Sequence, residues 1–86
     1  MNLDKYRKDI NEIDEKLSEL FQERLKIVEK IALYKKENKI EIYDKTREEQ
    51  VIINALNTLK DEKFSEEIKE FFKSMMDISK SYQKKL

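Results

Sequence analysis

The stretch that decides the fold is FQERLKIVEKIALYK, residues 21–35. Through it, and upstream of it, apolar residues recur at spacings of three and four, which is typical of one face of an α-helix. This face consists of Ile10, Ile13, Leu17, Leu20, Ile27, Ile31 and Tyr34. Arg24 stands between Leu20 and Ile27, where an apolar residue is expected, and Lys35 returns to nearly the same face about three turns later. A helix with two cations on the face that it should bury needs an explanation.

Composition narrows the possible functions. Nineteen Lys and Arg residues balance nineteen Asp and Glu residues, so no net charge points to nucleic acid or to an anionic membrane surface. The chain has no Cys and no His, which excludes zinc fingers, disulfides and catalysis by a thiolate or an imidazole. No apolar run has the length of a signal-peptide core or a membrane span. We therefore expect a cytoplasmic protein with no nucleic-acid and no membrane partner, and a single domain over residues 1–86.

The complete absence of Gly and Pro favours long helices without interruption. The first helix is expected to run from about Leu3 to about Asn38. The following segment NKIEIY, residues 38–43, alternates apolar and polar residues and therefore predicts an extended connection. The fold class expected from the whole pattern is all-α, with three helices of which the N-terminal one is very long.

Two shorter helices are expected after the connection. Asp44 or Thr46 can cap the first of them, and Thr46 with Glu49 three residues later fits a capping box. The polar segment LKDEKF, residues 59–64, predicts a loop, and Ser65 is expected to cap the last helix. The residues expected to be buried are Ile52, Ala55, Leu56 and Leu59 in the first of these helices, and Ile68, Phe71, Phe72, Met75, Met76 and Tyr82 in the last.

The length of the first helix predicts an assembly. About 36 helical residues span about 54 Å. A compact chain of this size has a radius of gyration near 12 Å and hence a diameter of roughly 30 Å. The helix therefore extends well beyond its own domain, and its exposed half needs a partner. Two copies that cover each other's long helix are the simplest solution, so we expect an intertwined homodimeric helical bundle.

Polar residues on apolar faces indicate a binding site. Only three of the nineteen basic residues are Arg, at positions 7, 24 and 47, which suggests a need for the planar, bidentate guanidinium. Further polar residues on expected apolar faces are Glu48, Ser79 and Gln83. Taken singly, each has a structural explanation at a helix end or through a backbone hydrogen bond. Together with Arg24 and Lys35 they predict a mostly cationic pocket inside a helical bundle, suited to a small anion with two carboxylates.

These residues resemble those of the all-helical chorismate mutases, the AroQ class, over essentially the whole chain. The likeness lies in YRKDINEIDEKL at residues 6–17, the pair Glu23–Arg24, Lys35, the D-x-x-R-E motif of Asp44, Arg47 and Glu48, and the pair Ser79 and Gln83. No single element is specific, but their order and spacing together form a strong signal. The loop before the last helix looks short beside the family pattern. This departure affects the expected shape of the pocket's lid.

The resemblance implies the rearrangement of chorismate to prephenate, on the route to phenylalanine and tyrosine, with no cofactor and no metal. It implies that Arg7 and Arg24 each bind a substrate carboxylate, while Lys35 and Gln83 donate to the ether oxygen. The other implied substrate-binding residues are Asp44, Arg47, Glu48 and Ser79. Arg7 lies about 25 Å from Arg24 along the helix, so it can reach this site only across an antiparallel homodimer.

Three alternatives remain open. An isochorismate pyruvate lyase on the same scaffold would use the same cationic pocket, although the complete D-x-x-R-E motif and Gln83 favour the mutase. A non-catalytic helical module that regulates an enzyme would not need the full set of polar residues. A plain coiled-coil dimerisation domain does not explain the second helix or Arg24. Whether the domain is free-standing or belongs to a fusion enzyme is also open.

Overall fold

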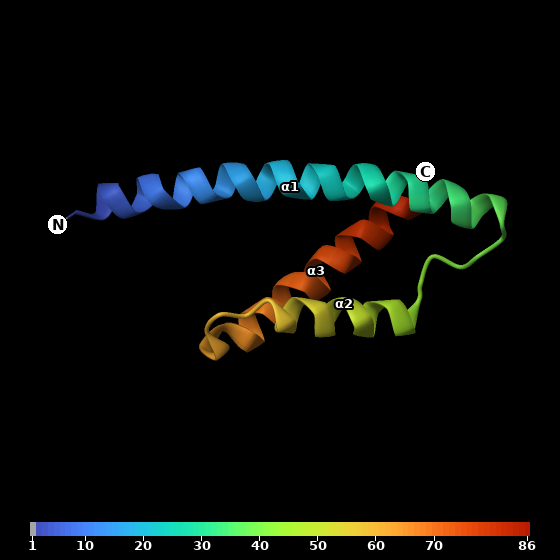
Figure 1. Cartoon of the computed structure of the whole chain (residues 1–86). Coiled ribbons are helices and arrows are strands. Elements are labelled where there is room, and N and C mark those ends of the chain that lie inside the picture. Colours follow the sequence, from blue (N-terminus) through green and yellow to red (C-terminus); the bar gives the residue numbers. More distant parts are fainter. Residues whose placement is uncertain (1) are drawn as a thin grey trace.

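A computed structural model describes residues 2–86 of the chain (Figure 1). The chain forms α1 (Leu3–Glu37), α2 (Lys45–Asn57) and α3 (Ser65–Lys84), with a short 3₁₀ turn, η1 (Glu62–Phe64), before α3. The expected class, all-α with one very long N-terminal helix, is confirmed. The expected extended connection is shorter than residues 38–43, because Asn38 and Lys39 form the turn that ends α1. Residues 40–44 make an irregular connection with a bend at Ile42.

The two ends of α1 are closed by local hydrogen bonds. At the start, the side chain of Asn2 accepts from the backbone N–H of Lys5 at 2.8 Å. At the end, Lys39 has a φ of 55°, and the N–H of Ile40 donates to the carbonyl of Lys35 at 2.8 Å. This is a Schellman-type ending, in which a left-handed residue turns the chain out of the helix. Glycine usually occupies that place, and this glycine-free chain uses a lysine.

Asp44 caps α2. Its side chain accepts from the backbone N–H of Arg47 at 3.0 Å, which satisfies one of the free donors of the first turn. Of the two cap residues expected from the sequence, Asp44 is therefore the correct one. Thr46 lies inside the helix, so the expected capping box with Glu49 is wrong.

The connection between α2 and α3 contains more structure than the expected loop. Asp61 caps η1 by accepting from the N–H of Lys63 at 3.1 Å. The chain then passes directly from this turn into α3 at Ser65, and no side chain caps that helix. The expected capping role of Ser65 is wrong because the 3₁₀ turn already leads the backbone into the helix.

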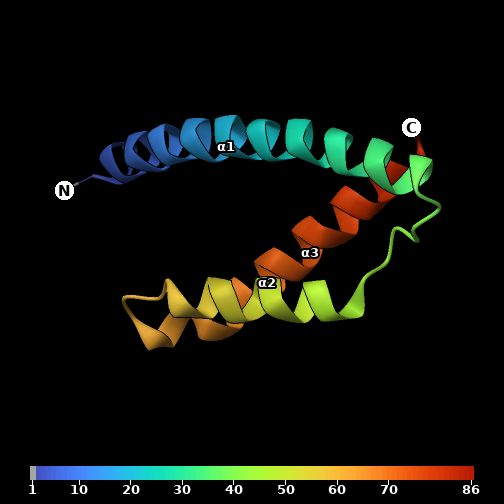
Figure 2. The same cartoon turned by 45° about the vertical axis from the view of Figure 1, so that its right-hand side comes forward.

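The helices pack as an α2–α3 hairpin joined to one end of α1. α3 packs along α2 and crosses to α1 only with its C-terminal part, while the N-terminal half of α1 stands clear of both (Figures 1 and 2). The buried apolar residues lie where the three helices approach one another: Val28, Ala32, Val51, Ala55, Met75 and Met76. None of the large side chains in residues 2–86 is completely buried. A single chain therefore has a thin core.

The expected buried faces of α2 and α3 are correct in part. In α2, Val51 is buried beside Ala55, whereas Ile52, Leu56 and Leu59 are only half-buried. Leu59 also lies beyond the end of the helix. In α3, Met75 and Met76 are buried, Ile68, Phe72 and Tyr82 are half-buried, and Phe71 remains 48% exposed. Phe71 lines an open groove together with Leu17 and Phe21 of α1, which leaves much of its ring exposed.

The long apolar stripe of α1 is not buried within the chain, which corrects the expectation from its spacing. Leu20 is 61% exposed and Ile27 58% exposed, because α3 covers the adjacent face that carries Val28 and Ala32. The molecule measures 56 × 25 × 16 Å, and its radius of gyration of 15.9 Å exceeds the value of about 12 Å for a compact chain of this length. The extended shape confirms that α1 overshoots its own domain. Within residues 2–86, no helix combines the length and the apolar character that crossing a bilayer requires.

Candidate active site

A cavity of about 230 Å³ lies between the three helices and the connection that precedes α2. Its walls contain seven of the eight site residues expected from the sequence, all but Arg7. The polar lining consists of Arg24, Lys35, Asp44, Arg47, Glu48, Ser79 and Gln83. The apolar lining consists of Ile27, Val28, Ile31, Ile42, Val51 and Met76. The polar residues that were expected on apolar faces of three separate helices therefore line one cavity.

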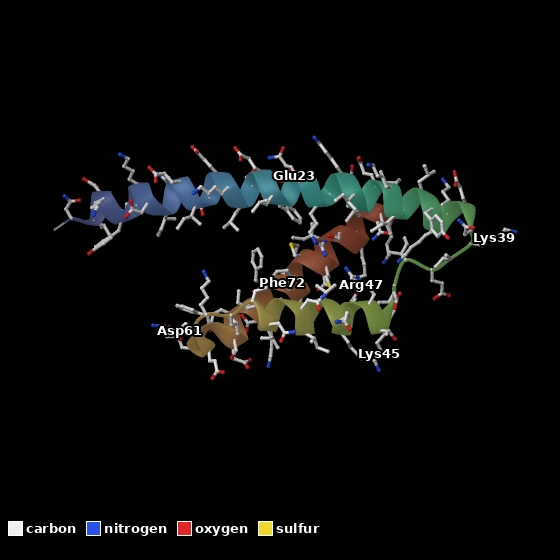
Figure 3. The ribbon with its side chains drawn as sticks, viewed as in Figure 1. Glu23, Lys39, Lys45, Arg47, Asp61 and Phe72 are labelled. Atoms are coloured by element: carbon white, nitrogen blue, oxygen red, sulfur yellow. The ribbon has the colours of Figure 1, made fainter. Side chains whose placement is uncertain are left out.

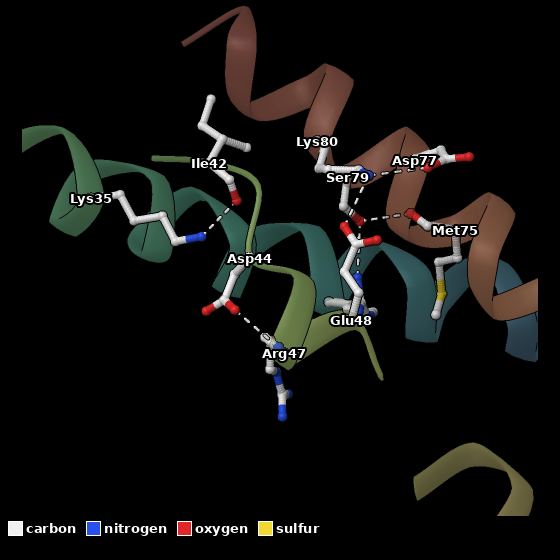
Figure 4. A network of polar contacts seen from close by, with 10 residues as sticks. Lys35, Ile42, Asp44, Arg47, Glu48, Met75, Asp77, Ser79 and Lys80 are labelled. Atoms are coloured by element: carbon white, nitrogen blue, oxygen red, sulfur yellow. Dashed lines mark hydrogen bonds and ion pairs between the residues drawn. The ribbon is translucent and has the colours of Figure 1, made fainter. Parts of the chain in front are cut away.

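Arg24 is fixed by a serine of α3. Its Nη1 donates to the Oγ of Ser79 at 2.9 Å, and this hydroxyl donates in turn to the backbone carbonyl of Met75 at 2.9 Å. The second of these bonds is drawn in Figure 4. Ser79 is only 5% exposed and is the buried polar residue of the described chain. Its hydroxyl thus orients a guanidinium that comes from another helix, in addition to forming the backbone bond expected of a serine within a helix.

Arg24 and Arg47 make the cavity electropositive. No carboxylate within residues 2–86 forms an ion pair with either guanidinium. Burial lowers the pKa of Arg24, and the positive charge of Arg47 lowers that pKa further. A guanidinium nevertheless keeps its proton in proteins, so the two like charges remain in place. Arg47 extends from α2 toward the other helices (Figure 3). A bound anion would offset both the desolvation and the repulsion.

Lys35 joins the end of α1 to the connection. Its Nζ donates to the carbonyl of Ile42 at 2.8 Å, and the side chain is half-buried (Figure 4). An ammonium group has three donors, and this bond uses one. Both residues line the cavity, so the remaining donors of Lys35 are available to a ligand there.

Asp44 and Glu48 bring acceptor groups to the cavity from the start of α2. The carboxylate of Asp44 is engaged in capping α2, and its carbonyl accepts from the backbone N–H of Glu48 at 3.0 Å. This places Glu48 in the first turn of the helix, where the helix dipole favours a negative charge. Among residues 2–86, no three acidic side chains gather closely enough to hold a metal ion.

Lys80 is a residue of this region that the sequence reasoning missed. Its Nζ pairs with Glu48 at 2.9 Å and with Asp77 at 3.3 Å, and it lies 5.0 Å from the centre of the Tyr43 ring. The spacing of Asp77 and Lys80 on one helix could have indicated their pairing. The pairing with Glu48 joins two helices and depends on how α3 packs on α2.

Gln83 brings an amide to the cavity from the last turns of α3. Its Oε1 is buried and has no hydrogen-bond partner within the described chain. The neighbouring Tyr82 donates from its hydroxyl to the carboxylate of Glu29, which ties this end of α3 to α1. A buried polar atom without a partner is uncommon in proteins, and Gln83 is one of the residues that line the cavity.

Arg7 lies elsewhere. It is exposed, in the half of α1 that stands clear of α2 and α3, and it does not line the cavity. Its place on a straight helix is about 25 Å from Arg24, as the residue spacing predicted. Within one chain the site therefore lacks the Arg that the sequence assigned to it.

Comparison with known proteins agrees with this geometry. The family model described as chorismate mutase type II matches residues 6–84, which include Arg7 and every residue that lines the cavity. No curated protein and no solved structure matches the chain significantly. Because the matched segment covers nearly the whole sequence, the chain belongs to the chorismate mutase type II family, whose all-helical members rearrange chorismate to prephenate.

Proposed function

We propose that the cavity between α1, α2 and α3 is the site at which this chorismate mutase binds and rearranges its substrate. The observation that carries the proposal is the pair of guanidinium groups, Arg24 and Arg47, which line one cavity and form no ion pair with a carboxylate of residues 2–86. Lys35 adds a third positive charge. Chorismate carries two carboxylates, so a bound substrate would neutralise charges that otherwise repel one another.

The substrate carboxylates are held by arginines in this proposal. Arg24 is already oriented by Ser79, so its remaining N–H groups can form a bidentate pair without a further loss of side-chain freedom. Arg47 lies beside it and completes the positive end of the site. The second carboxylate is assigned to Arg7 of a second chain, because Arg7 is exposed and remote from the cavity of its own chain.

Lys35 and Gln83 are assigned to the ether oxygen. The rearrangement is intramolecular and needs the enolpyruvyl group to fold over the ring, which is a task of positioning. As the carbon–oxygen bond breaks, negative charge grows on the ether oxygen, and donors aimed at it stabilise the transition state more than the substrate. Lys35 has donors to spare. Gln83 lines the cavity, and its amide supplies an NH₂ group that can donate without taking up a proton.

The ring hydroxyl of chorismate is assigned to the wall formed by α2. Glu48 supplies a carboxylate acceptor, and the backbone at Asp44 supplies polar groups beside it. Ser79 acts by orienting Arg24. These assignments give every polar residue of the cavity a task in binding or in charge stabilisation, and none of them requires proton transfer.

The shared site requires a homodimer, which we propose to be intertwined and antiparallel. The exposed stripe of α1, with Leu20 at 61% and Ile27 at 58%, offers an apolar surface to a second copy. A two-fold axis near the middle of α1 would bring the N-terminal half of one long helix over the cavity of the other chain. Residues 1–86 would then act as one mutase domain, and the cytoplasm stays the proposed compartment.

The direct test is to add chorismate to the purified protein and to follow its disappearance by absorbance while prephenate is identified by mass spectrometry. Arg24→Ala, compared with wild type at matched fold content, should lose most of the activity. Isochorismate is tested in parallel. Release of pyruvate from isochorismate, with chorismate left unchanged, would assign the site to a lyase instead.

A further inference from the structure

Beside the cavity, Lys80 contacts two carboxylates and one aromatic ring. Its Nζ pairs with Glu48 Oε2 at 2.9 Å and with Asp77 Oδ1 at 3.3 Å (Figure 4). It also lies over the ring of Tyr43, 5.0 Å from the ring centre. The Glu48 and Lys80 side chains are 26% and 23% exposed, whereas that of Asp77 is 61% exposed. Lys80 itself does not line the cavity. It can therefore affect a ligand there only through the residues that it holds.

A carboxylate in this cavity poses a problem that Lys80 can solve. Glu48 shares the wall with Arg24 and Arg47, both of which lack an ion-pair partner within residues 2–86. A carboxylate free to turn would be attracted to these guanidinium groups and could form the bidentate pair that they favour. Such a pair would occupy the positive site and compete with any incoming anion.

The structure instead shows Glu48 drawn to the α3 side. We infer that Lys80 is a positioning residue, which holds the Glu48 carboxylate away from Arg24 and Arg47 and so keeps the cationic site open to the substrate's carboxylates. This inference rests on the proposed function, because it takes the arginines to be the anion-binding groups. It adds a residue that touches no substrate and yet sets the affinity of the site.

Lys80 is suited to this task because it is itself fixed. Asp77 lies one turn earlier on the same helix, and Tyr43 approaches from the connection before α2, so the ammonium is held from more than one side. The hydrogen bond that Lys80 donates to Glu48 raises the pKa of Lys80, an effect that burial partly opposes and Asp77 reinforces. The ammonium therefore stays charged over the range in which the carboxylates are ionised.

The first test is Lys80→Met, which keeps most of the side-chain length and removes the charge. The KM for chorismate should rise about tenfold, the size of coupling found between neighbouring charged groups, while kcat changes less. Binding of the dianionic product prephenate, measured by calorimetry, should weaken by a similar factor. Lys80→Arg keeps a cation at this place and should stay within about threefold of wild type. Lys73→Met, on an exposed part of the same helix, is the matched control and should change neither quantity.

A double-mutant cycle separates this role from a general effect on the fold. In Glu48→Gln the side chain carries no charge to misplace, so adding Lys80→Met should raise KM no further. Melting temperatures of all the variants accompany the kinetics. An unchanged KM and prephenate affinity in Lys80→Met would overturn the inference. The same tenfold rise in the Glu48→Gln background would also overturn it, as would a loss in Lys80→Arg equal to that in Lys80→Met. A wild-type protein that binds neither chorismate nor prephenate would overturn the proposed function itself.

Discussion

The guanidinium of Arg24 on α1 donates through Nη1 to the hydroxyl of Ser79 on α3 at 2.9 Å, across 55 residues of sequence. The same hydroxyl donates to the Met75 carbonyl at 2.9 Å, so it acts as donor and acceptor at once. This contact ties the C-terminal part of α3 to α1 and fixes the direction of the guanidinium beside the cavity. In the proposed site, the packing of α3 on α1 and the binding of an anion by Arg24 therefore depend on the same hydrogen bond.

Ser79→Ala tests this shared bond. The backbone of α3 already satisfies the Met75 carbonyl, so the helix should persist, but Arg24 loses its acceptor and becomes free to move. We expect KM for chorismate to rise about tenfold, consistent with the loss of a hydrogen bond to a charged group. Steady-state kinetics provide the measurement. Ser81→Ala, an exposed serine on the same helix, serves as the control. Equal kinetics for both variants would contradict the orienting role.

Substitutions of Lys35 and Arg24 test the roles proposed for them, which are charge stabilisation by Lys35 and carboxylate binding by Arg24. Lys35→Ala removes a donor that the proposal assigns to the ether oxygen, and it should lower kcat by about 10² to 10³, as for other oxyanion donors. Arg24→Lys keeps a positive charge but loses the bidentate geometry of the guanidinium, so its kcat/KM should also fall strongly. Because Lys35 also donates to the Ile42 carbonyl, melting temperatures must show that the fold survives. A Lys35→Ala enzyme within about threefold of wild type in kcat/KM would remove the proposed mechanism.

Gln83→Glu tests the second donor through its pH dependence. A carboxylic acid can donate to the ether oxygen only while protonated, so the variant should be active at acidic pH and decline as it ionises. The ordinary Glu pKa is about 4.3, and burial in the cavity wall raises it while the nearby cations lower it. The wild-type amide does not titrate and should show no such decline. Identical profiles of kcat/KM against pH for the two proteins would place Gln83 outside the site.

The residues of the cavity could be predicted from the sequence because polar side chains on an apolar helix face are costly unless they serve a purpose. That reasoning identified Arg24, Lys35, Glu48, Ser79 and Gln83, and all of them line one cavity. It required only the period of each helix. No knowledge of the packing between helices was needed.

The side of α1 that is buried within the chain could not be predicted in the same way. A helix that contacts its own chain on one side and offers a second apolar side to another surface is apolar around much of its circumference. The spacing of Leu20 and Ile27 was as regular as that of Val28 and Ala32, yet only the second pair is buried within the chain. The role of Lys80 could not be predicted either, because its bond to Glu48 depends on how α3 crosses α2.

Lys39→Gly tests the strained end of α1. Lys39 adopts a φ of 55°, in the left-handed region that costs a residue with a Cβ roughly 1–2 kcal/mol. Glycine removes that cost but gains freedom in the unfolded chain, so we expect a net stabilisation of about 0.5–1 kcal/mol. Urea unfolding at several protein concentrations gives the free energy. Lys39→Ala keeps the Cβ and should show no gain. If both substitutions stabilise the protein equally, the left-handed strain is not the cause.

The last prediction concerns whether the site is shared between two chains. Arg7→Ala and Lys35→Ala should each be nearly inactive as homodimers, because every site then lacks one group. If the two variants are unfolded together in equal amounts and refolded, random pairing makes about half of the dimers hybrids. In each hybrid, one site receives Lys35 from the first variant and Arg7 from the second and is complete, while the other site collects both defects. About one site in four is intact, so activity should recover to about a quarter of wild type.

Recovery distinguishes a shared site from a separate one because no pairing can repair a site whose Arg7 and Lys35 come from the same chain. Mixing the folded variants without unfolding is the control, and it should restore activity slowly or not at all, because the helices of the proposed intertwined dimer must first separate. Size-exclusion chromatography establishes that the refolded material is dimeric. A dimeric, co-refolded mixture that stays as inactive as its parents would show that Arg7 does not act across the two-fold axis. The second carboxylate of the substrate would then need another partner, and Arg47, which already lines the cavity, would be the first to examine by substitution.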